Sequence, residues 1–106
     1  MNEFIKISTL EEYKKAIQEK CIIMFTTTWC PDCTFIKPFI GSIAKANPEF
    51  KYYHIDRDEM MDLCKEIDVL GIPSFIAYNE GKETNRFVSG LRKTKAEIES
   101  FVEASK

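Results

Sequence analysis

The spacing of apolar positions changes repeatedly along this chain, and it predicts alternating strands and helices. Short β-rich runs of apolar residues predict strands at 4–7, 21–27, 50–55, 73–78 and 83–89. Apolar positions three and four residues apart predict helices at 10–20, 30–46, 60–67 and from 94 toward the carboxyl end. A tight turn at 79–81 joins the last two strands, so we expect these two strands to form a hairpin.

The predicted order of elements, βαβαβαββα, is that of an α/β protein with a central mixed five-stranded sheet. Strand–helix–strand units imply parallel strands joined by right-handed crossovers, and the hairpin adds antiparallel strands at one side. The continuous apolar run at 21–27 is typical of a central strand that is buried on both faces. We therefore expect helices on both faces of the sheet.

Residues with a preference for helix ends sharpen these boundaries. Candidate caps stand at Ser8 or Thr9, at Asp58 and at Thr94. Glu97 completes a capping box for the last helix, and Gly71 is expected to end the region of the third. Pro38 lies inside the second helix and should kink it, because proline lacks the amide hydrogen and its ring crowds the preceding turn.

The composition is that of an ordinary globular protein, and we expect residues 1–106 to form one domain. Hydrophobic residues make up 44% of the chain, charged residues 30%, and the formal net charge is −2. This small net charge predicts neither a nucleic-acid partner nor a membrane partner. No apolar run is long enough to cross a membrane and the first residues lack the layout of a secretory signal, so we expect a cytoplasmic protein, and also a monomer.

The chain has four cysteines, and Cys30 and Cys33 stand close together where a buried strand meets a helix. In open α/β sheets this edge, at the carboxyl ends of the strands, is where active crevices form. A zinc or iron–sulfur site needs four ligands, which the isolated Cys21, Cys64 and His54 do not supply. We therefore expect no metal and no cofactor. We interpret Cys21 and Cys64 as core residues, since buried cysteine packs as a small hydrophobe.

Cys30 and Cys33 are expected to differ in their environment. Cys30 begins the helix, with Pro31 in the first turn, and faces free backbone N–H groups and the positive end of the helix dipole. Both favour the thiolate, so Cys30 is the expected nucleophile. Cys33 lies one turn deeper and can attack a mixed disulfide at Cys30. The pair predicts a redox centre that reduces disulfides and is restored by an external reductant.

The motif Trp29-Cys30-Pro31-Asp32-Cys33, together with Gly71-Ile72-Pro73, resembles the thioredoxin family over nearly the whole chain. The resemblance implies the thioredoxin fold and a cis peptide bond before Pro73. It implies a substrate-docking groove formed by Trp29, Pro31, Ile72, Pro73 and the Ser89-Gly90 turn. It also implies protein disulfides as substrates, with thioredoxin reductase or a low-molecular-weight thiol as the electron donor.

The chain departs from the family's pattern at several positions. Met24 stands where thioredoxins carry a buried aspartate that is thought to help deprotonate the second cysteine, and Tyr52 and Thr26 replace a lysine and a tryptophan. Between the cysteines, Pro-Asp replaces Gly-Pro. A negative charge near Cys30 opposes the thiolate, so we expect Asp32 to keep the pKa of Cys30 above that of an asparagine variant and to make the pair more reducing.

Two other functions are open on the sequence alone. Cys-Pro-x-Cys also occurs in glutaredoxins, so a reductase that depends on a small thiol is one alternative. The strand and helix that precede Cys30 favour the architecture of thioredoxin instead. The apolar residue at Met24 motivates the other alternative, a non-catalytic module of thioredoxin fold that holds a partner.

Overall fold

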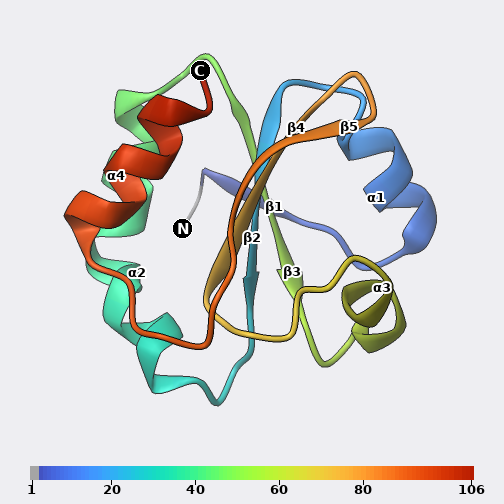
Figure 1. The fold of residues 1–106 in the computed structure, drawn as a ribbon, viewed down its shortest axis with the longest axis horizontal. Helices are drawn as coiled ribbons and strands as arrows, with labels where there is room; N and C mark the ends of the chain where they lie inside the picture. The colour runs from blue at the N-terminus through green and yellow to red at the C-terminus, as the bar shows by residue number, and fades with distance from the viewer. Residues whose placement is uncertain (1–2) are drawn as a thin grey trace.

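The computed structural model describes residues 3–106, and its elements follow the predicted order (Figure 1). They are β1 (Phe4–Lys6), α1 (Leu10–Ala16), β2 (Cys21–Thr26), α2 (Pro31–Ala46), β3 (Lys51–Asp56), α3 (Met61–Glu66), β4 (Ser74–Asn79), β5 (Lys82–Phe87) and α4 (Lys95–Ala104). The longest helix, α2, has 16 residues. No helix within residues 3–106 combines the length and the apolar character that crossing a membrane requires.

The five strands form one mixed sheet in the order β1-β3-β2-β4-β5, as the element order predicts. Strands β1, β3 and β2 run parallel, and β4 and β5 are antiparallel to their neighbours. Strand β2 lies at the centre, with Met24 paired to His54 of β3 on one side and to Phe75 of β4 on the other. The carboxyl ends of β1, β2 and β3 therefore lie at the same edge of the sheet.

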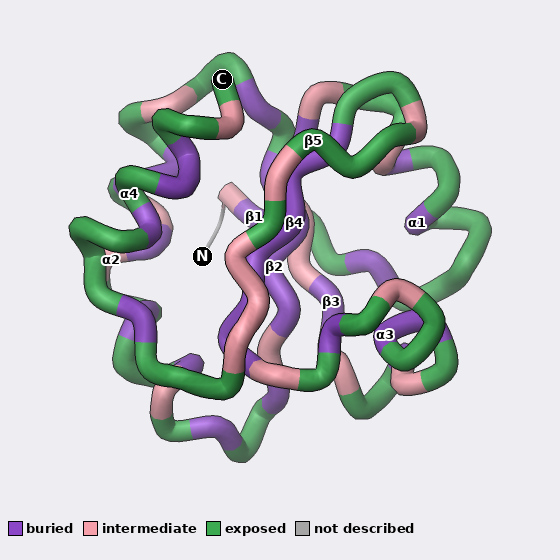
Figure 2. The backbone as a smooth tube through the Cα atoms, in the orientation of Figure 1, coloured by how far each residue is buried: buried purple, intermediate pink, exposed green. Residues whose placement is uncertain are grey.

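Helices cover both faces of the sheet, with α2 and α4 on one face and α1 and α3 on the other (Figure 1). Alternate residues of β2 supply the two layers of the core: Ile23 and Phe25 face α1 and α3, whereas Ile22 and Met24 face α2 and α4. All of β2 except its last residue is buried, as its continuous apolar run predicts. Figure 2 shows the buried segments along β2 and β4, and the more exposed β5 at the edge.

Capping boxes begin the first and last helices. The side chain of Thr9 accepts a hydrogen bond from the backbone N–H of Glu12, and Thr94 does the same for Glu97. Helix α1 ends at Ala16, not at residue 20 as the spacing predicts. The carbonyl groups of Ile17 and Gln18 instead accept hydrogen bonds from the turn between β4 and β5, so tertiary contacts end this helix early.

The third helix departs from the sequence-based boundaries at both ends. The prediction that Asp58 caps it is wrong, because α3 has no side-chain cap. Asp56 accepts hydrogen bonds from the backbone N–H groups of Asp58 and Glu59 instead, and so shapes the turn that precedes the helix. The helix ends at Glu66, and Asp68 adopts a φ of 59° soon after. Gly71 therefore lies beyond the helix end, in a loop whose role belongs to the site below.

Candidate active site

Cys30 is the N-cap of α2, as the sequence predicts. Its backbone is extended, and its sulfur accepts a hydrogen bond from the backbone N–H of Cys33 at 3.2 Å. Pro31 occupies the first helical position, where the missing amide hydrogen costs no hydrogen bond. The Cys30 sulfur thus takes the place of a capping oxygen and lies among the free N–H groups of the helix start.

Cys33 lies one turn further into the helix and is the more deeply buried of the pair, with an exposed fraction of 2% against 5% for Cys30. Burial, together with the interaction with the Cys30 sulfur, raises the pKa of Cys33 to about 12. A backbone hydrogen bond involving Thr27 acts in the opposite direction. The two sulfurs are therefore adjacent but unequal, and Cys33 needs help to lose its proton.

Trp29 stands at the edge of the site with 61% of its surface exposed. Its ring nitrogen donates a hydrogen bond to the carboxylate of Asp58 at 2.7 Å, and the guanidinium of Arg57 lies 5.6 Å from the ring centre. Arg57 also donates to Asp58 and, at 2.6 Å, to the carbonyl oxygen of Leu70. Arg57, which sequence reasoning missed, thereby ties Trp29 to the loop that leads to Pro73.

The peptide bond between Ile72 and Pro73 is cis, as the family resemblance implies. The Ile72 side chain is buried in the same apolar cluster as Cys30 and Cys33, so only its backbone is available to a docking chain. Gly71 touches the turn at Ser89 so closely that a Cβ atom there would lie 2.3 Å from the Ser89 carbonyl carbon. Gly71 is glycine because a second stretch of backbone occupies the space of a side chain.

Lys93 is 1% exposed, although lysine is seldom buried in proteins. Its ammonium group donates to the carbonyl and hydroxyl oxygens of Ser89, each at 3.1 Å, and to the carbonyl oxygen of Leu91 at 2.9 Å. Burial lowers the pKa of Lys93, and electrostatic interactions with Cys33, Glu97 and Asp32 oppose that shift. Lys93 therefore fixes the turn beside Pro73 and places a cation near the cysteines, which no local sequence pattern signals.

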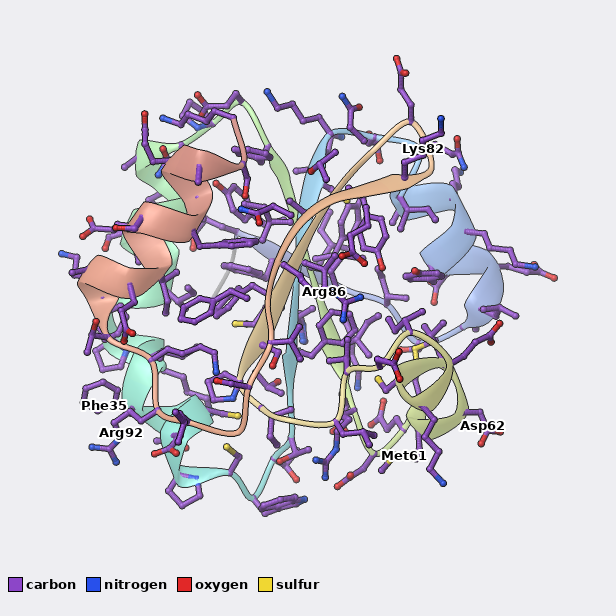
Figure 3. The ribbon with its side chains drawn as sticks, viewed as in Figure 1. Phe35, Met61, Asp62, Lys82, Arg86 and Arg92 are labelled. Atoms are coloured by element: carbon purple, nitrogen blue, oxygen red, sulfur yellow. The ribbon has the colours of Figure 1, made fainter. Side chains whose placement is uncertain are left out.

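Asp32 does not stand alone between the cysteines. Its carboxylate accepts a hydrogen bond from Nε of Arg92 at 2.9 Å, and the Arg92 guanidinium lies 4.4 Å from the ring centre of Phe35. Figure 3 shows Arg92 beside Phe35. The partner comes from a loop far along the chain, so the sequence did not reveal it. The effect of Asp32 on the reactivity of Cys30 stays a prediction. The positive charge of Arg92 lies next to the Asp32 carboxylate and should weaken that effect.

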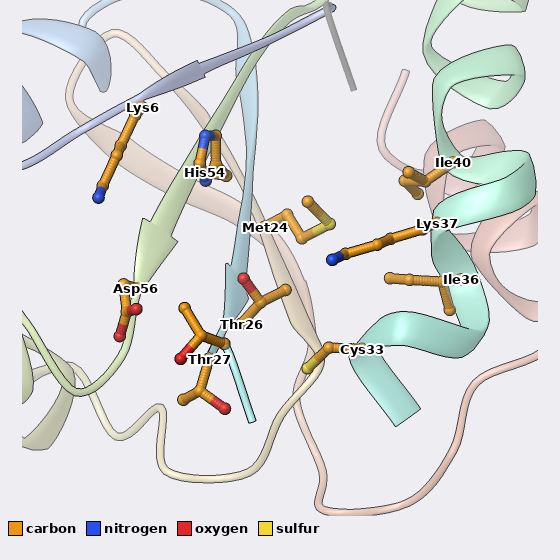
Figure 4. Close-up of a pocket in the computed structure, with 11 residues that line it drawn as sticks. Lys6, Met24, Thr26, Thr27, Cys33, Ile36, Lys37, Ile40, His54 and Asp56 are labelled. Atoms are coloured by element: carbon orange, nitrogen blue, oxygen red, sulfur yellow. The ribbon is translucent and has the colours of Figure 1, made fainter. Parts of the chain in front are cut away.

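A cavity of about 180 Å³ opens behind Cys33, between α2 and the carboxyl ends of β1, β2 and β3 (Figure 4). Met24, which is buried, and His54 both line it. Tyr52 does not line it; its hydroxyl donates to the carbonyl oxygen of Asn47. The sequence left His54 without a placement relative to the cysteines, and the structure places it in the same cavity as Cys33.

The remaining cysteines are packing residues. Cys21 and Cys64 are both fully buried, and burial raises the pKa of Cys21 to about 12 and that of Cys64 to about 11. Neither is therefore an activated thiol. Within residues 3–106, no group of three or more histidine, cysteine or acidic side chains is placed to hold a metal ion.

Comparisons of the sequence with a family model and with known relatives point to the same family. A model of the Thioredoxin family matches residues 4–104. An H-type thioredoxin from Fagopyrum esculentum is 32% identical over 97 residues, which cover 86% of this chain and 83% of the relative. A thioredoxin from Gallus gallus is 35% identical over 99 residues, with 91% and 93% covered. Both relatives match over most of their length.

Solved structures agree in fold. Mitochondrial thioredoxin 3 from Saccharomyces cerevisiae, in its oxidised form, matches with a TM-score of 0.83 at 24% identity, covering 97% of this chain and 96% of that chain. The mixed sheet and its helices are therefore the thioredoxin fold. With the family match over nearly the whole chain and the Cys30–Cys33 pair at the start of α2, this chain belongs to the thioredoxin family of thiol–disulfide oxidoreductases.

Proposed function

We propose that this oxidoreductase reduces disulfides of protein substrates, with Cys30 as the attacking sulfur and Cys33 as the resolving sulfur. The observation that carries the proposal is the asymmetry of the pair. Cys30 caps α2 and accepts a backbone N–H, whereas burial and the adjacent Cys30 hold the pKa of Cys33 at about 12. A thiolate forms more readily where N–H groups and a helix dipole face the sulfur.

The reaction follows in two exchanges. The Cys30 thiolate attacks one sulfur of the substrate disulfide, the substrate S–S bond breaks, and its electron pair leaves on the other substrate sulfur. Cys33 then loses its proton and attacks Cys30, which breaks the mixed disulfide and releases the second substrate thiolate. Two electrons have passed to the substrate, and the protein holds a Cys30–Cys33 disulfide.

Exposed apolar side chains in the segments that flank the site support a protein substrate. Trp29, Leu70 and Leu91 are 61%, 53% and 75% exposed, and they belong to the most exposed large apolar side chains of residues 3–106. Trp29 and Leu70 are held by Arg57, and Leu91 by Lys93. Exposed apolar side chains favour contact with a polypeptide. We propose that Pro31, Pro73 and Gly90 take part in the same docking surface.

The electron donor is proposed to be a thioredoxin reductase, as for thioredoxins in general. A low-molecular-weight thiol such as glutathione is the competing donor, and it would make the chain a glutaredoxin-like reductase. The cytoplasmic location and the monomeric state stay predictions.

A turnover assay tests the function. Reduction of insulin disulfides, driven by dithiothreitol, should occur with the unmodified protein and be lost in Cys30→Ser. Cys64→Ala serves as the matched control, because Cys64 is fully buried with a pKa raised to about 11, and the substitution should leave turnover within about twofold. Catalysis that survives Cys30→Ser would contradict the proposal. A Cys30→Ser protein that still performs its role in the cell would favour the partner-holding module. Comparing thioredoxin reductase with glutathione as the reductant separates the two donors.

A further inference from the structure

Polar side chains gather in the cavity behind Cys33, and the register of the sheet explains why. Side chains two residues apart on a strand share a face, so Met24 and Thr26 of β2, and His54 and Asp56 of β3, face α2. Lys6 of β1 is paired with His54 and adds a cation to the same place. In Figure 4 the Cys33 sulfur points from α2 toward these strands.

The resolving step of the proposed reaction needs a proton acceptor in this region. Cys33 must become a thiolate to attack the mixed disulfide, and its buried position opposes that change. Met24, which lines the cavity next to Cys33, carries no group that accepts a proton. Met24 is therefore not the acceptor, and the other groups of the cavity are the candidates.

His54 is the group that fits. Lys6 from β1 and Lys37 from α2 are the cations that line the cavity, and an ammonium group has no lone pair to accept a proton. Asp56 from β3 uses one carboxylate oxygen to accept two backbone N–H groups, and Glu59 is ion-paired with Lys6 at 3.1 Å.

The imidazole of His54 has a free lone pair when it is neutral. Burial, helped by Lys6, lowers the pKa of His54, while Asp56 and Glu59 oppose the shift. Neutral imidazole is therefore the resting form near pH 7.

A buried hydroxyl indicates how the proton travels. Oγ1 of Thr27 is buried and has no hydrogen-bond partner among residues 3–106, although Thr27 lines the cavity beside Cys33. Buried hydroxyl groups are normally satisfied by protein or by water. A cavity of about 180 Å³ has room for several water molecules at about 30 Å³ each in the liquid. Water bound to Thr27 can bridge Cys33 to the polar strand ends.

We propose that His54, through water in this cavity, accepts the proton that Cys33 releases when it attacks the mixed disulfide at Cys30. The Cys33 S–H bond breaks, the proton passes through water to the imidazole, and the Cys33 electron pair forms the new S–S bond with Cys30. The bond from Cys30 to the substrate breaks, and the substrate sulfur leaves with its electron pair. His54 becomes imidazolium and returns its proton to solvent. This role of His54 rests on the proposed function of the cysteine pair.

A rapid-mixing experiment separates the two exchanges. An aromatic disulfide whose released thiol is coloured gives one colour change when Cys30 attacks and a second when Cys33 resolves the mixed disulfide. The reduced unmodified protein is compared with His54→Gln between about pH 5 and 8, across the range in which histidine titrates. Tyr53→Phe is the matched control, because Tyr53 precedes His54 on β3 but packs with the opposite layer of the core.

The second phase should be about 10- to 100-fold slower in His54→Gln at pH 7, with the first phase unchanged. In the unmodified protein and in Tyr53→Phe, the second phase should rise with pH as His54 becomes neutral, and this rise should be missing in His54→Gln. An unchanged second phase with the same pH profile overturns the role of His54. Equal slowing of both phases also overturns it, because a structural defect would act on both. If Cys33→Ser shows no first phase, the proposed function itself fails and this inference with it.

Discussion

Arg92 donates a hydrogen bond of 2.9 Å from Nε to Oδ1 of Asp32, one of the two residues between the cysteines. The pair is half exposed, with 55% and 32% of the two side chains accessible. A carboxylate beside Cys30 disfavours the thiolate, and a guanidinium bound to it cancels part of that effect. The charge that the substrate meets next to Cys30 is therefore set by two residues far apart in the sequence.

Removing Arg92 should slow the reaction of Cys30 with iodoacetamide. Arg92→Gln leaves Asp32 unpaired, and we expect a two- to fivefold decrease in rate at pH 7, about the size of an exposed ion pair. The same substitution in an Asp32→Asn background should have a smaller effect, since the carboxylate it unmasks is gone. Equal effects in both backgrounds would show that Arg92 acts on Cys30 directly and that the pair is incidental.

Gly71 and Gly90 should respond differently to alanine. At Gly71 a Cβ atom would lie 2.3 Å from backbone of Ser89, whereas at Gly90 nothing lies within 4 Å. Gly71→Ala should lower the free energy of unfolding by about 1–3 kcal/mol, because backbone must move. Gly90→Ala should change it by less than about 0.5 kcal/mol. Urea denaturation measures both, and equal losses would contradict the close contact between the two loops.

Arg57 should act on substrate docking more than on chemistry. Its guanidinium lies against the Trp29 ring and donates hydrogen bonds to the Asp58 carboxylate and to the Leu70 carbonyl oxygen. Asp58 in turn accepts a hydrogen bond from the Trp29 ring nitrogen. Arg57→Leu should raise the KM for insulin by about tenfold, equivalent to about 1.4 kcal/mol, with little change in the rate with a small disulfide. The KM of Arg57→Lys should lie between that of Arg57→Leu and that of the unmodified protein, because lysine lacks the paired donors of the guanidinium. An unchanged KM would show that Trp29 holds its position without Arg57.

His54 should make stability depend on pH between 5 and 7. Burial lowers its pKa in the folded chain below the usual value near 6.5. The unfolded chain therefore binds a proton first as the pH falls, so stability decreases through this window and is regained as the pH rises. In His54→Gln, the free energy of unfolding should not show this decrease at low pH. Denaturation at pH 5 and pH 7.5 checks it, and an equal decrease in both proteins would assign the effect to other groups.

Local patterns in the sequence predicted the elements but not all of their ends. Strand β2 and the capping box at Thr94 were predictable, because unbroken apolar runs and capping residues act locally. The end of α1 was not, since it is set by hydrogen bonds to a distant turn. Distant contacts also explain the wrong prediction for Asp58. Its carboxylate accepts hydrogen bonds from Trp29 and Arg57 and does not cap α3.

The same division holds for the site. Cys30, Cys33 and the cis bond before Pro73 could be predicted from a motif and a family resemblance. Lys93 and His54 could not, because their importance lies in burial and in contacts across the sheet. A lysine two residues before a helix looks like a surface residue in any sequence.

The most direct test of the central claim is to locate the substrate adduct by mass spectrometry. Reduced Cys33→Ser is mixed with insulin, free thiols are blocked, and the peptides are mapped without reduction. The account predicts a mixed disulfide between insulin and Cys30 in Cys33→Ser. It predicts no adduct in the double variant that carries both Cys30→Ser and Cys33→Ser. An adduct on Cys21 or Cys64, or none in Cys33→Ser, would contradict the assignment of Cys30 as the attacking sulfur.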